Sequence, residues 1–177
     1  DDLDVLQLEK VNAIQSASNS LIEIINELLE YSKLSAGLEP FESIDFNFYR
    51  LVRDVEYLCK TLIVQKNVSL EVVIDSAIPE VLVGDPAKLS QVLLNLLGNA
   101  IKFVGEGQIR FNILLKKNAK GRLYIEFMIS DNGIGIEAEH LPFIFDSFRQ
   151  ASSDTSTTYG GTGLGLSIVK QIVTQLD

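Results

Sequence analysis

A stretch from Asp4 to about Ser35 contains no Gly or Pro and carries apolar residues in a seven-residue repeat. The repeat forms two rows, which are Ile14, Leu21 and Leu28, and Ala17, Ile24 and Tyr31. This pattern predicts one helix that is long for a chain of 177 residues. Because Ile22, Ile25 and Leu29 widen the apolar stripe, we expect the helix to pack in a four-helix bundle.

The segment from Ser35 to Pro40 ends this helix, since Gly37 suits a left-handed helix cap and Pro40 cannot continue the turn. We therefore predict a helical appendage at residues 1–36 and a separate domain at residues 37–177. A chain of 177 residues is long enough for one ordinary domain with such an appendage.

The second part reads as an alternation of strands and helices. Strands are expected at 41–46, 68–74, 81–83, 108–116 and 122–131, of which the last two form an antiparallel hairpin. Helices are expected at 47–66, with Asn47 as N-cap, at 86–104, with Pro86 at its first position, near 143–148, and from about Gly163. Their expected buried faces are Leu51, Val55, Leu58 and Leu62 on the first, and Leu89, Val92, Leu93, Leu96, Ala100 and Phe103 on the second.

Charge and composition exclude several classes of function. With 15 Lys and Arg against 24 Asp and Glu, the net charge is −9, and no basic cluster offers a surface for nucleic acid or anionic membrane. No apolar run approaches the roughly 20 residues that span a bilayer, so we expect this segment to be cytoplasmic. Cys59 is the single cysteine, which rules out an internal disulfide and predicts a buried thiol.

A polar stripe runs along the predicted helix at 86–104. Its members recur at steps of three and four residues, and they are Lys88, Gln91, Asn95, Asn99 and Lys102. Amide carbonyl oxygens suit a hydrated Mg²⁺, and an ammonium group neutralises phosphate. Taken alone, such a stripe is more often a solvated helix face than a ligand site.

A glycine-containing turn follows the strand at 122–131. Asp131 stands at the strand end, and Gly133 and Gly135 would let a flat ring approach the backbone, so Asp131 can accept a hydrogen bond from an exocyclic amine such as adenine N6. An ordinary tight turn is the simplest alternative. Residues 133–138 also fit the GxGxxG/A dinucleotide pattern, but no strand-helix-strand unit surrounds them.

A second glycine cluster, Gly160 to Leu166, leads directly into the last helix. Glycines at a helix N-terminus expose N–H donors and the positive end of the helix dipole, which together favour phosphate. The lysine of a GxxxxGK[ST] loop is missing, so this is not a P-loop. A flexible hinge is the alternative, and the polar stretch Gln150 to Tyr159 is the best candidate for a mobile loop. His140, the only histidine, is expected to be a structural or surface residue.

Taken in order, these motifs resemble the catalytic domain of sensor histidine kinases in the GHKL ATPase superfamily. The boxes of that family are matched by Asn95 to Lys102 (N box), Asp131 to Gly135 (G1), Phe145 to Phe148 (F) and Gly161 to Leu166 (G2). Residues 150–159 fall where the family has its ATP lid. The helix ending in Leu28 to Leu34 is similar to the second helix of the dimerisation and phosphoacceptor hairpin.

The resemblance implies an α/β sandwich, in which a mixed sheet has helices on one face and ATP binds between the helices and the lid. It implies that Asn95 and Asn99 bind Mg²⁺, that Lys102 binds phosphate, and that Asp131 recognises adenine. The other residues implied in nucleotide binding are Gly133, Gly135, Phe148, Gly161, Thr162, Gly163, Leu164 and Gly165. Arg149 matches a basic position that can approach the γ-phosphate, which makes Asn95, Lys102 and Arg149 the candidate catalytic residues. The implied reaction is transfer of that phosphoryl group to a histidine.

The implied partners are ATP or ADP, a homodimer partner, a phosphoacceptor helix and a response-regulator receiver domain. The first hairpin helix, with the acceptor histidine, and the last strands of the domain have no counterpart in this sequence, so we expect that the chain alone does not autophosphorylate. Two alternatives remain. An ATP-hydrolysing relative would carry a glutamate base where Asn95 stands, and an amide cannot take the proton. A module that binds a partner without using ATP would not need all four boxes.

Overall fold

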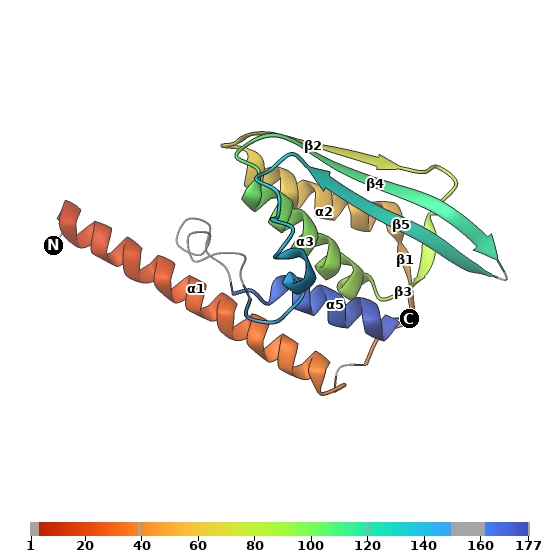
Figure 1. Cartoon of the computed structure of the whole chain (residues 1–177), viewed down its shortest axis with the longest axis horizontal. Helices are drawn as coiled ribbons and strands as arrows, with labels where there is room; N and C mark the ends of the chain where they lie inside the picture. Colours follow the sequence, from red (N-terminus) through yellow and green to blue (C-terminus); the bar gives the residue numbers. More distant parts are fainter. Residues whose placement is uncertain (1–3, 39, 120, 150–161, 177) are drawn as a thin grey trace.

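The computed structural model describes residues 4–38, 40–119, 121–149 and 162–176. In Figure 1 a sheet covers two helices, and a third helix lies on their other side, next to a long N-terminal helix. The stretch 150–159 and Gly161 lie outside the described residues.

The N-terminal helix α1 spans Val5–Ser35, as its apolar repeat predicted. Asp4 caps its start by accepting a hydrogen bond from the N–H of Gln7 at 2.8 Å, and Gly37 follows its end with φ of 61°. The N-terminal part of α1 extends away from the domain, while its C-terminal part packs on α5, which spans Gly165–Leu176 (Figure 1).

The main sheet is mixed, with the strand order β2-β4-β5. Strand β2 (Asn67–Ile74) pairs in parallel with β4 (Glu106–Ala119), which forms the predicted antiparallel hairpin with β5 (Arg122–Asp131). A separate antiparallel pair joins β1 (Ile44–Asn47) to β3 (Val81–Gly84), so the first strand begins later than expected. The mixed α/β fold expected from the sequence is confirmed.

Two capped helices, α2 (Phe48–Ile63) and α3 (Pro86–Phe103), lie on one face of this sheet (Figure 1). The side chain of Asn47 accepts from the N–H of Arg50 at 2.8 Å, which confirms the predicted cap of α2. Along β2, side chains alternate between exposed and half-buried, as expected when helices cover a single face. The core between the layers includes Phe48, Val52, Leu93, Leu97, Ile109, Phe111 and Ile113.

The predicted buried faces of α2 and α3 are partly wrong. On α2, Leu58 and Leu62 are 48% and 61% exposed, and the buried row continues instead through Cys59 and Ile63. On α3, Leu97 and Ile101 are buried, whereas Leu96 and Phe103 are half-buried. Both helices carry apolar residues around more of their circumference than one contact can cover, so the apolar pattern alone does not select the row that meets the sheet.

The aromatic segment near 143–148 does not form the expected helix. A single 3₁₀ turn, η1, spans Leu141–Phe143, and Phe148 has a positive φ of 63° that no helix can contain. A second core cluster, formed by Leu34, Leu164, Ile168 and Ile172, joins α1 to α5. Across the described ranges, no helix has the length and apolarity needed to cross a bilayer.

Candidate functional site

Two loops that are remote in sequence each contact α3, whose polar residues Asn95, Asn99 and Lys102 are half-buried. At the C-terminal end of α3, the N–H of Ile134 donates to the carbonyl of Phe103 at 3.3 Å. Further back along α3, Oδ1 of Asn95 lies 3.5 Å from the point where a Cβ on Gly165 would stand. Helix α3 therefore brings the turn after β5 and the start of α5 to one surface.

The turn after β5 is held by the side chains of the two residues that precede Gly133. Asp131 uses Oδ1 to accept from the N–H of Gly133 at 2.8 Å, and Asn132 uses Oδ1 to accept from the N–H of Gln108 at 2.8 Å. A Cβ on Gly133 would stand 2.7 Å from the carbonyl oxygen of Phe103, so only glycine fits here. This geometry leaves Oδ2 of the exposed Asp131 outside the turn hydrogen bond.

The same turn excludes the dinucleotide-binding interpretation of residues 133–138. After Asp131 the chain enters bends and turns, and the next helical element in the described chain is the short η1. A dinucleotide site of that type requires a helix that begins within the glycine motif itself.

The described part of the second glycine cluster is ordered by Thr162. Its hydroxyl donates to a carboxylate oxygen of Glu27 on α1 and accepts from the N–H of Leu164 at 3.1 Å. Gly163 has φ of 73°, and a Cβ there would lie 3.0 Å from the carbonyl oxygen of Arg149. Leu164 is 1% exposed and belongs to the second core cluster, so its backbone, rather than its side chain, is available to a ligand.

The predicted F-box residues lie beside this cluster. The N–H of Phe148 donates to the carbonyl of Gly163 at 3.1 Å, and its ring meets the ring of Tyr31 edge-on with centroids 6.2 Å apart. Arg149 forms an ion pair with Asp146 at 3.2 Å, and its guanidinium lies 4.2 Å from the ring centroid of Phe143. In this structure the guanidinium of Arg149 is therefore bound within its own loop.

Lys102 is the basic residue of this surface. Burial lowers its pKa from the ordinary value, and the carboxylate of Glu27 opposes that change. Its ammonium group also lies 5.1 Å from the ring centroid of Phe103. A partly desolvated cation of this kind interacts more strongly with an anion than a fully hydrated one does.

The family follows from a comparison with known proteins. Residues 84–177 match the family described as "Histidine kinase-, DNA gyrase B-, and HSP90-like ATPase". The chain belongs to this family. Among its relatives, hybrid signal transduction histidine kinase B of Dictyostelium discoideum is 38% identical over 170 residues, which cover 96% of this chain and 9% of that protein.

Solved structures of this family agree with the fold. Full-length ShkA in complex with AMPPNP matches with a TM-score of 0.80 and 26% identity, covering 98% of this chain and 35% of that one. Histidine kinase ThkA in complex with the response regulator protein TrrA matches with a TM-score of 0.66 and 29% identity, covering 99% and 46%. This chain thus spans less than half of the length of each of these three proteins. The prediction of an ATP-binding catalytic module of the histidine kinase type is confirmed at the level of the family.

The sequence did not predict several contacts that surround α3. Lys88, assigned to the polar stripe, is 7% exposed, and its Nζ lies 3.5 Å from Oε1 of Glu30 on α1. Asn132 and Glu27 were not singled out either. Asn132 follows directly on an aspartate in a turn, which is a usable signal for a side chain that bonds to backbone. The contact of Glu27 with Thr162 joins residues far apart in the chain, and no local pattern indicates it.

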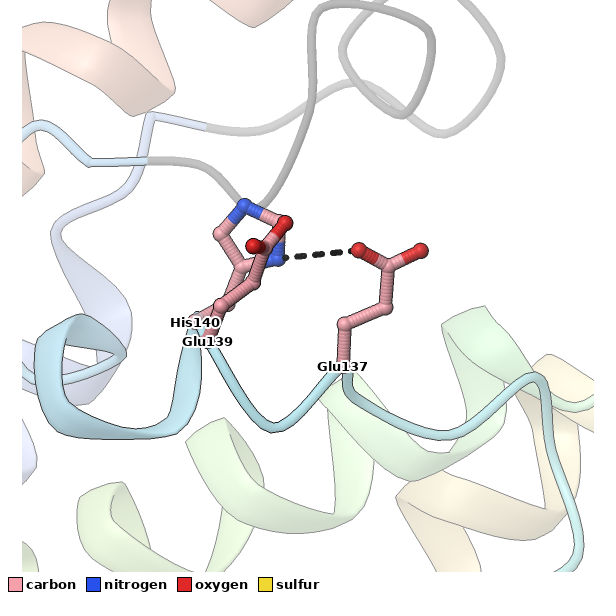
Figure 2. A group of neighbouring side chains, drawn as sticks. All are labelled: Glu137, Glu139 and His140. Carbon is pink, nitrogen blue, oxygen red and sulfur yellow. Dashed lines mark ion pairs between the residues drawn. The ribbon is translucent and has the colours of Figure 1, made fainter.

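A cluster of Glu137, Glu139 and His140 stands on the loop between β5 and η1 (Figure 2). Their ligand atoms all lie within 4.8 Å of one another, and Nδ1 of His140 is 3.6 Å from Oε2 of Glu137. Both glutamates are exposed and His140 is half-buried, in agreement with the expected structural or surface role of the histidine. Exposed acidic groups commonly gather in this way without a metal, so we assign no function to the cluster.

Proposed function

We propose that this chain is the catalytic module of a two-component sensor histidine kinase, which binds ATP with Mg²⁺ and transfers the γ-phosphoryl group to a histidine of a phosphoacceptor helix. The observation that carries the proposal is the convergence of the turn after β5 and the start of α5 on the half-buried face of α3 that bears Asn95, Asn99 and Lys102. Its relative ShkA is described in complex with AMPPNP, an ATP analogue, which supports the same ligand here.

The adenine end of the site is assigned to the turn after β5. The Oδ2 atom of Asp131 is the proposed acceptor for the N6 amine, because Oδ1 already holds the turn through the N–H of Gly133. Gly133 and Gly135 carry no side chain that would obstruct a purine ring. Phe148, a residue that is 62% exposed, is proposed to cover the nucleotide from the other side.

The phosphate end is assigned to α3 and the start of α5. Asn95 and Asn99 offer amide oxygens one helical turn apart, a donor set that fits Mg²⁺, which also keeps several waters. When bound, Mg²⁺ would neutralise phosphate charge. Lys102 adds a positive charge one turn further along, and Thr162, Gly163 and Gly165 lead to the positive end of the α5 dipole. Arg149 would have to leave Asp146 to reach a γ-phosphate.

The chemistry proposed for these residues is positioning and charge neutralisation. The N box has Asn95 where a hydrolysing relative needs a glutamate, and an amide cannot take a proton from water. A phosphoryl group passing through a loose transition state needs little covalent help, so aligned donors and cations supply most of the acceleration. Transfer to a protein nucleophile therefore fits these residues better than hydrolysis.

We further propose that residues 1–36 are the second helix of a dimerisation and phosphoacceptor hairpin and residues 37–177 the catalytic domain. The exposure of the apolar rows on α1 supports this division, because Ile14, Leu21 and Leu28 are left without cover in this chain. A homodimer partner and an acceptor helix would bury them. A receiver domain is proposed as the downstream partner, since the relative ThkA is described in complex with a response regulator.

The test of nucleotide binding is a calorimetric titration of the chain with ADP, with and without Mg²⁺. We expect saturable binding that weakens when EDTA removes the metal. Asn95→Ala should lose most of the dependence on Mg²⁺, whereas Asn118→Ala, an exposed amide at the far end of β4, should bind as the unmodified chain does. No heat and no thermal shift at millimolar nucleotide would reject the proposal.

Transfer is tested separately with labelled ATP, Mg²⁺ and a phosphoacceptor hairpin supplied as a second protein. Label on the histidine of that hairpin, lost in the Asn95→Ala variant, is the expected result. Free inorganic phosphate released at the same rate with and without the hairpin would instead indicate an ATPase.

A further inference from the structure

Helix α1 contacts residues at both ends of the proposed nucleotide site, Thr162 at the phosphate end and Phe148 at the adenine end. The carboxylate of Glu27 accepts a hydrogen bond from the hydroxyl of Thr162. One turn further along α1, Tyr31 meets the ring of Phe148. The fully buried Leu34 fixes this arrangement by packing against α5 in the second core cluster. A carboxylate of α1 is thereby held among groups that otherwise suit an anionic ligand.

We propose that Glu27 is an internal competitor for nucleotide phosphate, so that a bound polyphosphate and the docked α1 weaken each other. The inference rests on the proposed function, because it needs a phosphate site at Thr162 and Lys102. In the docked state the Glu27 carboxylate takes the hydroxyl of Thr162 and supplies negative charge beside the phosphate-binding face of α3. A polyphosphate that enters must displace that carboxylate or bear its repulsion.

Electrostatics at Lys102 agree with this role. Burial lowers the pKa of Lys102, and the Glu27 carboxylate raises it again, so the two side chains interact across the α1 contact. A phosphate group at Lys102 would make the same interaction. Because coupling between two binding events is reciprocal, nucleotide should loosen α1 by the same factor by which docked α1 weakens nucleotide.

A neighbouring ion pair provides a matched control. Glu30 lies almost one turn from Glu27 on α1 and forms an ion pair with Lys88 of α3. Lys88 is buried near the start of α3 and is not among the assigned phosphate ligands. Glu30→Gln therefore removes the same charge from α1 without touching the site, while the buried Leu34 keeps α1 docked on α5. Glu9→Gln, in the exposed N-terminal part of α1, controls for net charge alone.

The experiment measures the dissociation constants of Mg-ATP, Mg-ADP and adenosine for the unmodified chain and for Glu27→Gln, Glu30→Gln and Glu9→Gln. The amide of a glutamine can still accept from Thr162, so the contact survives while the charge is lost. We expect Glu27→Gln to tighten Mg-ATP by at least about fivefold, Mg-ADP by less and adenosine not at all. The two control variants should bind all three ligands as the unmodified chain does.

Tightening by Glu30→Gln to the same extent would show that negative charge on docked α1 in general, and not competition at the site, sets the affinity, and would overturn the inference. Unchanged or weaker Mg-ATP binding by Glu27→Gln would overturn it as well, while leaving the proposed function intact. If the unmodified chain binds no nucleotide, the proposed function fails and the inference fails with it.

Discussion

The backbone N–H of Phe148 donates to the carbonyl of Gly163 at 3.1 Å, and both residues have positive φ, 63° and 73°. A left-handed conformation costs an aromatic residue such as Phe148 on the order of 1–3 kcal/mol, so the surrounding structure must hold it there. The hydrogen bond to Gly163 and the ring contact with Tyr31 are the described interactions that do so. The conformation of the loop at Phe148 thus depends on Gly163, which lies 15 residues later in the sequence.

Replacing Gly163 with alanine should therefore disturb both segments. The substitution adds a left-handed penalty of about 1–2 kcal/mol and places a Cβ 3.0 Å from the carbonyl oxygen of Arg149. Gly37→Ala is the matched control, because Gly37 has φ of 61° but nothing within 4 Å of a new Cβ. Urea denaturation should show the larger loss of unfolding free energy for Gly163→Ala, and only that variant should also weaken ADP. Equal losses in the two variants would mean that the contact with Arg149 is unimportant.

Asp131→Asn should weaken adenine nucleotides and leave the fold unchanged. Asparagine keeps an Oδ1 acceptor for the N–H of Gly133, so the turn survives, but it replaces Oδ2 with an amino group that faces the N6 amine as a donor. Loss of a hydrogen bond to a charged group costs roughly 1.5–3 kcal/mol, which corresponds to at least about tenfold in affinity. Calorimetry with ADP measures the change, and circular dichroism checks the fold. An unchanged dissociation constant would leave Asp131 with only its turn-forming role.

The elements that the sequence predicts well are those set by neighbouring residues. Asn47 begins α2 through its side-chain cap, and Gly37 ends α1 through its left-handed backbone. The hairpin of β4 and β5 follows from two alternating runs joined by a short polar turn. The glycine cluster likewise leads directly into α5. Such signals are local, so a single sequence contains them in full.

Contacts between distant segments are the part that could not be predicted. Lys88 repeats with the amides of α3 at helical spacing, yet it is buried because α1 brings Glu30 to it. Leu58 and Leu62 are apolar and yet exposed, since the sheet meets a neighbouring row of α2. Each case depends on which surface another element covers. Helical periodicity identifies an apolar row but does not identify its partner.

Cys59 should make stability depend on pH at the alkaline end. Burial, and secondarily the Glu56 carboxylate, raise the pKa of its thiol from 9.0 to about 11. Between these values the unfolded chain loses the thiol proton and the folded chain keeps it, so the free energy of unfolding falls as pH rises, by at most about 3 kcal/mol. Denaturant midpoints at pH 8.5 and 10.5 should separate more for the unmodified chain than for Cys59→Ala. The same pH dependence in both would exclude the thiol as its source.

The chain incubated alone with labelled ATP and Mg²⁺ should not become phosphorylated on histidine. Its only histidine is His140, on the loop between β5 and η1, where its Nδ1 faces Glu137 at 3.6 Å. That loop belongs to the domain that binds the nucleotide, whereas the proposed reaction uses a histidine on a dimerisation helix. A nearby carboxylate also repels an incoming phosphoryl group, which carries negative charge on its oxygens.

Acid-labile label is therefore expected only when a separate acceptor hairpin is added, at a rate limited by the absence of a covalent tether. Acid-labile label on the chain alone, mapped to His140 and lost in His140→Ala, would contradict this assignment of the acceptor.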